Sequence, residues 1–598
     1  MSGIVGIFHR DGRFVAADQL RSMTDFLAYR GPDGQDIWIG SQVGFGHALL
    51  NTSEGLPAQK QPVHMESLWI TADVRLDSKA DLVRKLQTLG RRIEGQSSDA
   101  GLILHAYAAW GPGCVDHLLG DFSFAVWDSV AKTLFCARDH FGIKPFYYAE
   151  AGKVLIFSNT LNCLRTHTDI TNEINEEAIG DFLLFGWNYN ESSTSFRDIQ
   201  RLPPAHWLLV SPEGLRVKRY WYPPTQDRIR YTRSEDYIDD FMELFQAAVV
   251  DRLPPDRAGI LLGGGLDSGT VAAVAAAFSK SRRGSPSLRS YTAGYDRLIP
   301  DNDHWFALQT ADYVGIPNEY LPLDNVRLLE KQECAGYNHP EPGTGLFFTT
   351  KIELYRRIAV HSRVALSGEG SDNLMHFQMW PYIKELSGHG EWTRLLFETA
   401  WFLWLRPFPW LGVARKAQSI FGKVSGDAEI PRWIAPEFAK RTRLKERWAQ
   451  NHKLVFPSEG HAVRPKAHAS MLIPQWAGLF ESDDPGVTRY PVEVRYPFLD
   501  LRIVRYLLAI PVFPWAYKKY LLRKSMYKKL PETVRLRPKT PVLRDPIQAK
   551  IREMGVTRIN EGPLSPQAAE FISPGFENLT GTDEIRAYSL RKWLEGIS

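Results

Sequence analysis

The chain has 598 residues, of which 44% are hydrophobic and 23% are charged, a composition typical of soluble globular proteins. Its 72 basic and 68 acidic residues leave a formal net charge of +4, which is too small over this length to predict binding to nucleic acid or to a membrane. The length predicts at least two domains. The most apolar stretch, residues 395–414, is interrupted by charges and prolines and is too short for a membrane span, and no signal peptide is visible, so we expect a cytoplasmic enzyme.

Residues 1 to about 210 carry short strand-like runs between glycine and aspartate turns, among them LWITADVRL, DFSFAVWD, TLFCARD and VLIFSN. Helix-like stretches such as DAGLILHAYAAWG lie between these runs, with apolar residues at helical spacing. This order predicts stacked sheets with helices outside. The polar, proline-bearing residues 222–236 are a predicted linker. Four scattered cysteines, without C-x-x-C spacing, predict buried reduced thiols rather than disulfides or a zinc site.

After the linker, strands alternate with helices: DYIDDFMELFQAAVVDRL, AGILL, TVAAVAAAFS, SLRSYTAGY and HWFALQTADYVG. Such alternation predicts a parallel, doubly wound α/β sheet. The last third of the chain predicts mostly helix.

Two glycine loops follow strands of this predicted sheet. GGGLDSG (263–269) lies between a strand and a helix, where glycines let the backbone approach an anion and a helix N-terminus offers free N–H groups. The loop lacks the lysine of a Walker A motif. LSGEGSDNL (366–374) repeats the arrangement, and Asp267 and Asp372 together predict two carboxylate ligands for one Mg²⁺ ion beside phosphate oxygens.

These loops, with EVRYPFLD (493–500) and KYLLRKSMYKKLPETVRLRPK (519–539), resemble the asparagine synthetase family of PP-loop ATP pyrophosphatases. GIVGIF, YRGPDG, GDFSFAVWD and ARDHFGIKPFYY near the front resemble the glutaminase half of that family. The resemblance implies an N-terminal Ntn-type αββα sandwich over residues 1–215. It also implies, over residues 235–598, a doubly wound parallel α/β synthetase domain with a helical extension. The implied enzyme is an AMP-forming carbon–nitrogen ligase, in which ATP adenylates a carboxylate and an amine then attacks the acyl-adenylate.

The resemblance also implies roles for single residues. Asp267 and Asp372 would hold Mg²⁺, Lys539 would stabilise the phosphates and the adenylate oxyanion, and Glu369 would take the proton of the attacking amine. The residues that would bind ATP are Gly264, Gly265, Leu266, Asp267, Ser268 and Gly368. Gly263, Gly269 and Asn373 depart from the family pattern, which weakens phosphate or metal contacts without removing either carboxylate.

The implied glutaminase site is degenerate. Ser2 stands where glutamine-using members have a cysteine nucleophile, and Leu49 where they have the arginine that binds the glutamine carboxylate. Ala72 and Asp73 replace the Asn–Gly pair that stabilises the oxyanion, while Asp99 is retained. These losses predict an inactive glutaminase.

Without ammonia from glutamine, the amine must come from elsewhere. This points toward the branch whose substrate carries its own amine, the β-lactam synthetases and lasso-peptide cyclases. PVEVRYPFLDLRIVRYLLAIP and RPKTPVLRDP look most like lasso-peptide cyclases, which join a peptide N-terminal amine to an Asp or Glu side chain and so form a macrolactam. That branch implies a precursor peptide substrate, a precursor-recognition protein and a leader peptidase as partners. An aromatic-rich insertion at about 376–490 would grip the peptide or would form a helical core. Two alternatives remain: an asparagine synthetase that uses ammonia, or glutamine through Ser2, and a non-catalytic scaffold of a biosynthetic complex.

Overall fold

The computed structural model describes most of the chain. Its described residues are 1–52, 60–93, 97–225, 229–281, 284–324, 339–343, 348–404, 430–455, 460–539, 546–553, 563–573, 579 and 581–597.

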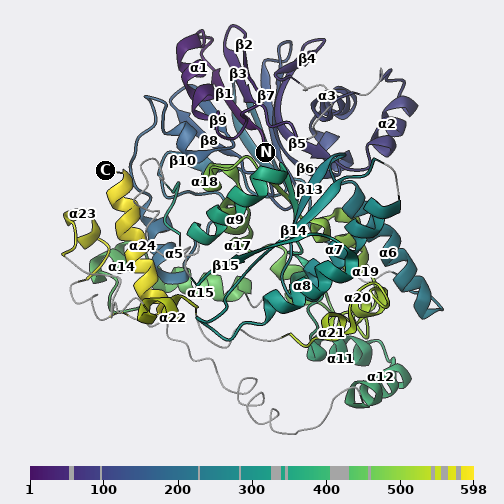
Figure 1. The fold of residues 1–598 in the computed structure, drawn as a ribbon. Helices are drawn as coiled ribbons and strands as arrows, with labels where there is room; N and C mark the ends of the chain where they lie inside the picture. Colours follow the sequence, from purple (N-terminus) through teal and green to yellow (C-terminus); the bar gives the residue numbers. More distant parts are fainter. Residues whose placement is uncertain are drawn as a thin grey trace.

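The N-terminal domain is built from two six-stranded antiparallel sheets (Figure 1). The first has the order β10-β8-β9-β1-β3-β2, with bounds β1 Gly3–His9, β2 Gln35–Ile39, β3 Val43–Ala48, β8 Tyr147–Ala151, β9 Val154–Ser158 and β10 Ile199–Arg201. The second has the order β12-β11-β7-β6-β5-β4, with bounds β4 Val63–Met65, β5 Leu68–Leu76, β6 Gly120–Asp128, β7 Thr133–Arg138, β11 His206–Ser211 and β12 Gly214–Arg219.

Strand β1 explains why this sequence forms a central strand of a sandwich. Ile4 and Phe8 belong to a core cluster that also contains Ala125 of the second sheet. Val5 and Ile7 belong to a core on the opposite face of the strand. Because alternate side chains point to opposite faces of a strand, both faces of β1 are apolar and buried. Helix α1 (Ala17–Phe26) packs on the first sheet and α3 (Asp99–Trp110) on the second. The predicted αββα sandwich is confirmed.

The C-terminal domain contains a five-stranded parallel sheet in the order β15-β14-β13-β16-β17. The strands are β13 Arg257–Leu261, β14 Ser287–Gly294, β15 Asn318–Pro322, β16 Val364–Leu366 and β17 Glu493–Arg495. The principal helices packed with them are α6 Ser234–Val250, α7 Leu266–Ser281, α8 Asp303–Val314, α9 Phe348–His361 and α19 Leu501–Ala509. The strand order reverses between β13 and β16, so the predicted doubly wound sheet is confirmed. Ligands of such sheets bind at this reversal, beyond the carboxyl ends of the strands.

The other described helices after residue 370 are mostly short, and the last third of the chain is mostly helical, as predicted. Their bounds are α10 Ser371–Leu374, α11 Met379–Gly388, α12 Trp392–Trp404, α14 Pro436–Arg441, α15 Leu444–Val455, α16 Pro465–Ser470, α17 Gln475–Asp483, α18 Pro485–Thr488, α20 Tyr520–Ser525, α21 Glu532–Arg535, α22 Pro546–Glu553, α23 Pro566–Ala569 and α24 Gly581–Ile597. None of the helices in the described part of the chain has both the length and the apolar character to cross a membrane.

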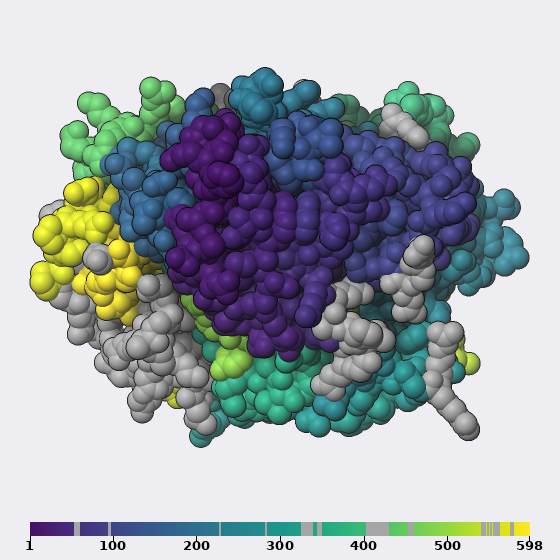
Figure 2. All heavy atoms as spheres, turned by 90° about the horizontal axis from the view of Figure 1, so that it is seen from above, coloured from purple at the N-terminus to yellow at the C-terminus, as the bar shows by residue number. Residues whose placement is uncertain are grey.

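The end of the chain returns to the N-terminal domain. Trp433, Phe571 and Trp593 share one buried core with Val5 and Phe182, although they follow them by hundreds of residues. Figure 2 shows the yellow C-terminal residues lying directly beside the first 200 residues. A separate hydrogen-bonded contact joins α24 to α5 (Glu176–Phe185), because the Arg586 guanidinium donates to two backbone carbonyls near the end of α5.

The aromatic-rich insertion is therefore divided between different environments. Trp433 is buried in the core shared with the N-terminal domain, whereas Trp380 of α11 and Trp392 of α12 are exposed. Trp410 and the side chain of Trp404 lie outside the described residues. The described cysteines, Cys114, Cys136 and Cys163, are buried free thiols, as predicted, and Cys334 lies outside the described residues.

Buried ion pairs join the two domains. Each pair joins a residue of the N-terminal domain to a residue of the C-terminal domain. The pairs are Arg30–Asp484, Lys144–Glu493, Asp77–Arg252 and Arg201–Glu481. Removing one partner of such a pair leaves an uncompensated charge in the interior, so these contacts fix how the domains dock.

Candidate active sites in the two domains

The two glycine loops meet at the reversal of the parallel sheet. The first joins β13 to α7, and the second joins β16 to α10. A Cβ atom on Gly368 would lie 2.6 Å from the backbone nitrogen of Ser268, so only glycine allows this contact. The structure therefore brings together the loops in which the sequence predicted the ATP-binding residues.

One lysine bridges the two predicted magnesium carboxylates. The Nζ atom of Lys519 lies 2.5 Å from a carboxylate oxygen of Asp267 and 2.5 Å from one of Asp372. The Ser371 hydroxyl donates to Asp267 over 2.9 Å, and Lys539 Nζ lies 2.7 Å from the second oxygen of Asp372. Lys539 is 78% exposed and Lys519 only 17%. Lys519 is thus the more firmly held cation of the site, although no individual role was predicted for it from the sequence.

The local electrostatics differ between the two carboxylates. Burial, together with the negative charge of Asp372, leaves the pKa of Asp267 raised, although the Lys519 ammonium acts to lower it. Burial also acts to raise the pKa of Asp372, but Lys519 and Lys539 outweigh it and leave that pKa below its usual value. Lys519 itself has a left-handed φ of 55°, a conformation that costs a non-glycine residue roughly 1–3 kcal/mol. Backbone strain of this kind occurs often at functional sites, where the surrounding structure holds a residue in an unfavourable conformation.

The first glycine loop, residues 263–269, is closed by its own side chains and by Arg537. The Ser268 hydroxyl accepts from the backbone N–H of Gly263 over 3.1 Å. Arg537 donates to the carbonyl of Gly264 over 2.9 Å and forms an ion pair with Asp303 at 2.7 Å. The side chain of Leu266 is buried in the core of the domain, so this residue can offer a phosphate only its backbone.

Glu369 lies where negative charge accumulates. Its side chain is exposed, but the surrounding protein still removes part of its hydration, and this partial burial raises its pKa. The negative charges of Asp483, Asp267 and Asp372 raise the pKa further. A raised pKa brings a carboxylate closer to the range in which it can accept and release a proton near neutral pH. This environment suits the predicted role as the base for an amine.

The carboxylates at this site are suited to a metal only together with a nucleotide. Among the described residues there is no group of three or more His, Cys, Asp or Glu side chains that would hold a metal ion. Asp267 and Asp372 supply two hard oxygen donors around one cation position, and Mg²⁺ commonly combines one or two carboxylates with phosphate oxygens and water. The residues present therefore fit Mg²⁺ bound with ATP phosphates.

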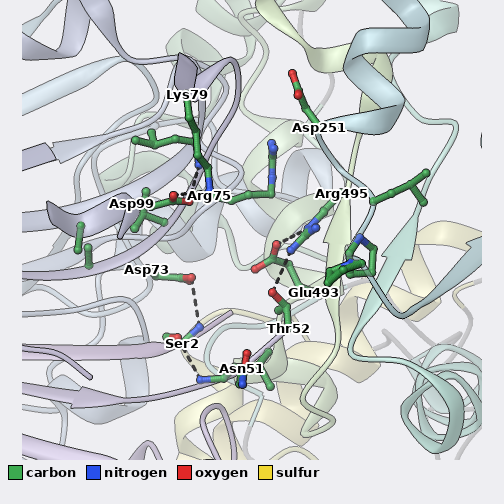
Figure 3. Close-up of a pocket in the computed structure, with 18 of the residues that line it drawn as sticks. Ser2, Asn51, Thr52, Asp73, Arg75, Lys79, Asp99, Asp251, Glu493 and Arg495 are labelled. Atoms are coloured by element: carbon green, nitrogen blue, oxygen red, sulfur yellow. Dashed lines mark hydrogen bonds and ion pairs between the residues drawn. The ribbon is translucent and has the colours of Figure 1, made fainter. Parts of the chain in front are cut away.

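The predicted degenerate glutaminase residues lie around a different cavity, of about 770 Å³ (Figure 3). Ser2, Leu49, Ala72, Asp73 and Asp99 all line it. Glu493 and Arg495 of β17 close its far side, so the cavity lies between the domains.

The predicted glutaminase residues of this cavity are paired with one another and with their neighbours. The backbone N–H of Ser2 donates to the Asp73 carboxylate over 3.2 Å, and the Ser2 hydroxyl accepts from the Leu50 N–H over 3.1 Å. The backbone N–H of Ala72 is occupied by the Gln61 side chain at 2.7 Å. Asp99 is paired with Lys79 at 2.6 Å.

Comparisons with known proteins agree with this two-part architecture. The family model for the glutamine amidotransferase domain matches residues 1–221, and the asparagine synthase model matches residues 240–574. The chain belongs to the asparagine synthase family. As a member of this family it is an ATP-dependent carbon–nitrogen ligase. The resemblance to the asparagine synthetase family that its motifs indicated is confirmed.

Three curated relatives are similar to the chain at 27–29% identity. "Asparagine synthetase [glutamine-hydrolyzing] 3" of Bacillus subtilis is 27% identical over 571 residues, covering 90% of this chain and 86% of the relative. "Asparagine synthetase [glutamine-hydrolyzing] 2" of the same organism is 29% identical over 394 residues, covering 62% of this chain and 51% of the relative. "Amidase chry2" of Gibberella zeae is 27% identical over 384 residues, covering 60% of this chain and 55% of the relative.

Proposed function

We propose that this protein adenylates a carboxylate with ATP and joins it to an amine carried by the same substrate. The favoured substrate is a peptide, which would be closed into a macrolactam between its N-terminal amine and an Asp or Glu side chain, as the resemblance to lasso-peptide cyclases implies. The observation that carries this proposal is the Asp73 carboxylate, which accepts a hydrogen bond from the backbone of Ser2.

The position of Asp73 argues against glutamine as the amine source. Attack of Ser2 on glutamine would create an oxyanion, which needs hydrogen-bond donors aimed at it. In this cavity the nearby side chain is a carboxylate, and the N–H of Ala72 already donates to Gln61. Leu49 has no charge with which to bind the glutamine carboxylate.

The reaction would proceed in two balanced steps. A substrate carboxylate oxygen attacks the α-phosphorus of ATP, and pyrophosphate leaves. The amine then attacks the acyl carbon, AMP leaves, and Glu369 takes the proton of the amine. Asp267 and Asp372 would hold the Mg²⁺ that neutralises phosphate charge, while Lys519 and Lys539 would stabilise the charge that develops on the phosphates.

Two other functions are weighed against this one. The names of the Bacillus subtilis relatives favour an asparagine synthetase, which would amidate free aspartate with ammonia, or with glutamine through Ser2. A non-catalytic scaffold would turn over no ATP, although the intact Asp267–Lys519–Asp372 cluster argues for a working site. Under the favoured function, a precursor-recognition protein and a leader peptidase are the expected partners.

The deciding experiment measures AMP release from ATP and Mg²⁺ with three substrate sets: aspartate with glutamine, aspartate with ammonium, and a core peptide carrying an internal Asp or Glu. The proposal predicts AMP only with the peptide, together with a product lighter by one water in mass spectrometry. AMP with free aspartate would favour the asparagine synthetase. No AMP in any set, with the expected partner proteins present, would favour the scaffold.

A further inference from the structure

Arg523 lies on α20, and neither site described above has a role for it. Its side chain is partly buried, and each of its three guanidinium nitrogens donates to a different backbone carbonyl. Nε donates to Lys518 over 2.8 Å, Nη2 donates to Arg537 over 2.9 Å, and Nη1 donates to Arg535. Because these partners are backbone oxygens rather than carboxylates, the side chain ties segments of backbone together.

The first of these carbonyls belongs to the turn that presents Lys519. Lys518 and Lys519 are both in the left-handed region, with φ angles of 48° and 55°. Residues other than glycine persist in this region only where the surrounding structure holds them. The bond from Arg523 holds the peptide unit between the two lysines, and Tyr517 just before them packs on the ring of Phe377 with centroids 5.4 Å apart. The position of the Lys519 backbone therefore depends on Arg523.

The other two carbonyls belong to the segment that leads to Lys539. Arg535 is the last residue of α21, and Arg537 lies between that helix and Lys539. Arg535 returns a hydrogen bond to the carbonyl of Arg523 over 3.2 Å, so α20 and α21 are tied in both directions, and Figure 1 shows them side by side. Arg537 in turn donates to Gly264 of the first glycine loop. One side chain thus connects the turn of the first lysine to the segment of the second.

We propose that Arg523 is a positioning residue, which fixes the Lys519 and Lys539 ammonium groups relative to each other so that both face the same phosphates. The inference rests on the roles that the proposed function gives these lysines. Their Nζ atoms lie 2.5 and 2.7 Å from the two oxygens of one carboxylate, Asp372, although they come from separate segments. A planar guanidinium can reach carbonyls on both segments at once, whereas a lysine ammonium at the same place is a single point of charge.

Three variants separate positioning from general stability. Arg523→Met removes all three donors and keeps an unbranched apolar side chain, and Arg523→Lys keeps the charge without the planar fork. Arg586→Met is a matched control, because Arg586 is also partly buried and also donates to two backbone carbonyls, but at the contact between α24 and α5. Loss of such backbone contacts is therefore common to both methionine variants, and only one of them lies beside the lysines.

The measurements are AMP formation with the acid substrate that the wild type uses, and the affinity for a fluorescent ATP analogue with Mg²⁺. We expect Arg523→Met to lower kcat by about 10²-fold, the cost of a misplacement of about 1 Å at a reacting centre, with the KM for the acid substrate little changed. Arg523→Lys should recover only part of this loss. Arg586→Met should keep the kcat of the wild type, even where its melting temperature falls.

A double-mutant cycle gives a readout that a merely structural role would not move. Once Lys519→Met and Lys539→Met are both present, Arg523→Met should lower kcat and ATP affinity little further, because no ammonium group is left to position. An equal loss in the two backgrounds would overturn the inference, and so would a wild-type kcat in Arg523→Met. If Arg523→Met does not fold, Arg523→Gln, which keeps one amide donor group, replaces it in the cycle.

Failure of the inference can be told apart from failure of the proposed function. If the wild type forms AMP with free aspartate and not with a peptide, the proposed substrate is wrong, and the cycle tests Arg523 in the aspartate reaction. If no acid substrate yields AMP, the affinity for the ATP analogue in the same cycle decides the role of Arg523. If the wild type does not bind the analogue either, the inference falls together with the proposed function.

Discussion

Lys144 of the N-terminal domain lies 2.8 Å from Glu493 of the C-terminal sheet, and both side chains are almost wholly buried. Burial favours the neutral form of each group, but the nearby charges outweigh it. The carboxylates of Asp73 and Glu493 raise the pKa of Lys144, and Lys144 with Arg495 holds the pKa of Glu493 well below its usual value. Both groups are therefore charged at neutral pH, and the pair couples the Ser2 cavity to the synthetase domain.

Replacing Lys144 by methionine should destabilise the protein, because it leaves two buried carboxylates without this cation. Loss of one partner of a buried pair costs about 3–5 kcal/mol. Thermal unfolding should show a lower melting temperature, whereas Lys153→Met, at an exposed position, should not. A melting temperature equal to that of the wild type would contradict the role assigned to the pair.

The pH dependence of this destabilisation has a defined sign. The pKa of Glu493 is depressed in the folded protein, so its contribution is present above the unfolded value near 4.5 and is lost as pH falls toward the folded pKa. The pKa of Lys144 is raised, so its contribution is present below the unfolded value of 10.5 and is lost as pH rises past the folded pKa. The difference between wild type and Lys144→Met should therefore be largest near neutral pH and smaller in acid.

Lys519→Met should reduce AMP formation by about 10²-fold or more, the cost typical of losing one group that stabilises developing charge. The change also leaves Asp267 and Asp372 without their shared ammonium neighbour. Lys524→Met, an exposed position on helix α20, which begins directly after Lys519, is the control. AMP formation at the control rate in Lys519→Met would remove Lys519 from the site.

Ser2→Ala should leave peptide-dependent AMP formation unchanged, and Ser2→Cys should not create glutaminase activity. The reason is that a better nucleophile does not replace the missing donors while the Asp73 carboxylate and the Gln61–Ala72 hydrogen bonds remain. Release of glutamate from glutamine is the measurement. Glutamate released by Ser2→Cys at rates comparable to AMP formation would show that the cavity still stabilises an oxyanion.

Peptide cyclisation should lose activity in acid at a pH above the ordinary glutamate pKa of 4.5, because the pKa of Glu369 is raised and the base must be ionised to act. Glu369→Gln should lower kcat by about 10²–10⁴-fold and remove this acidic limb from the profile of kcat/KM against pH. If the acidic limb of the profile is unchanged in the Glu369→Gln variant, the ionisation that causes it belongs to another group.

The sequence predicted the two sheets and the meeting of the glycine loops, because both depend on local patterns. A strand followed by glycines and a carboxylate is a local signal, and the alternation of strands and helices determines where two such loops meet. Lys519 was not distinguished from its neighbours, because only the tertiary fold and an unusual backbone conformation bring it between Asp267 and Asp372. The side chains that donate to Asp73 come from Lys144 and Asn159, which are remote in the sequence.

The sequence also placed residues 235–598 in one domain, and the structure adds that α24 and Trp433 complete the core of the other. Apolar spacing predicts that a helix has a buried face, but not which distant surface covers it. For the same reason, the spacing of the tryptophans in the insertion did not predict that Trp433 would be buried and Trp380 exposed.

The return of α24 to the first domain has a consequence for synthesis on the ribosome. Strands β1 to β10 are complete by residue 201, but the apolar surface beside Phe182 is covered only when Trp593 has been made. At about 5–20 residues per second, the nascent chain carries that surface uncovered for on the order of tens of seconds. The first domain to be translated is therefore among the last to finish folding, and loss of α24 would leave the core of that domain incomplete.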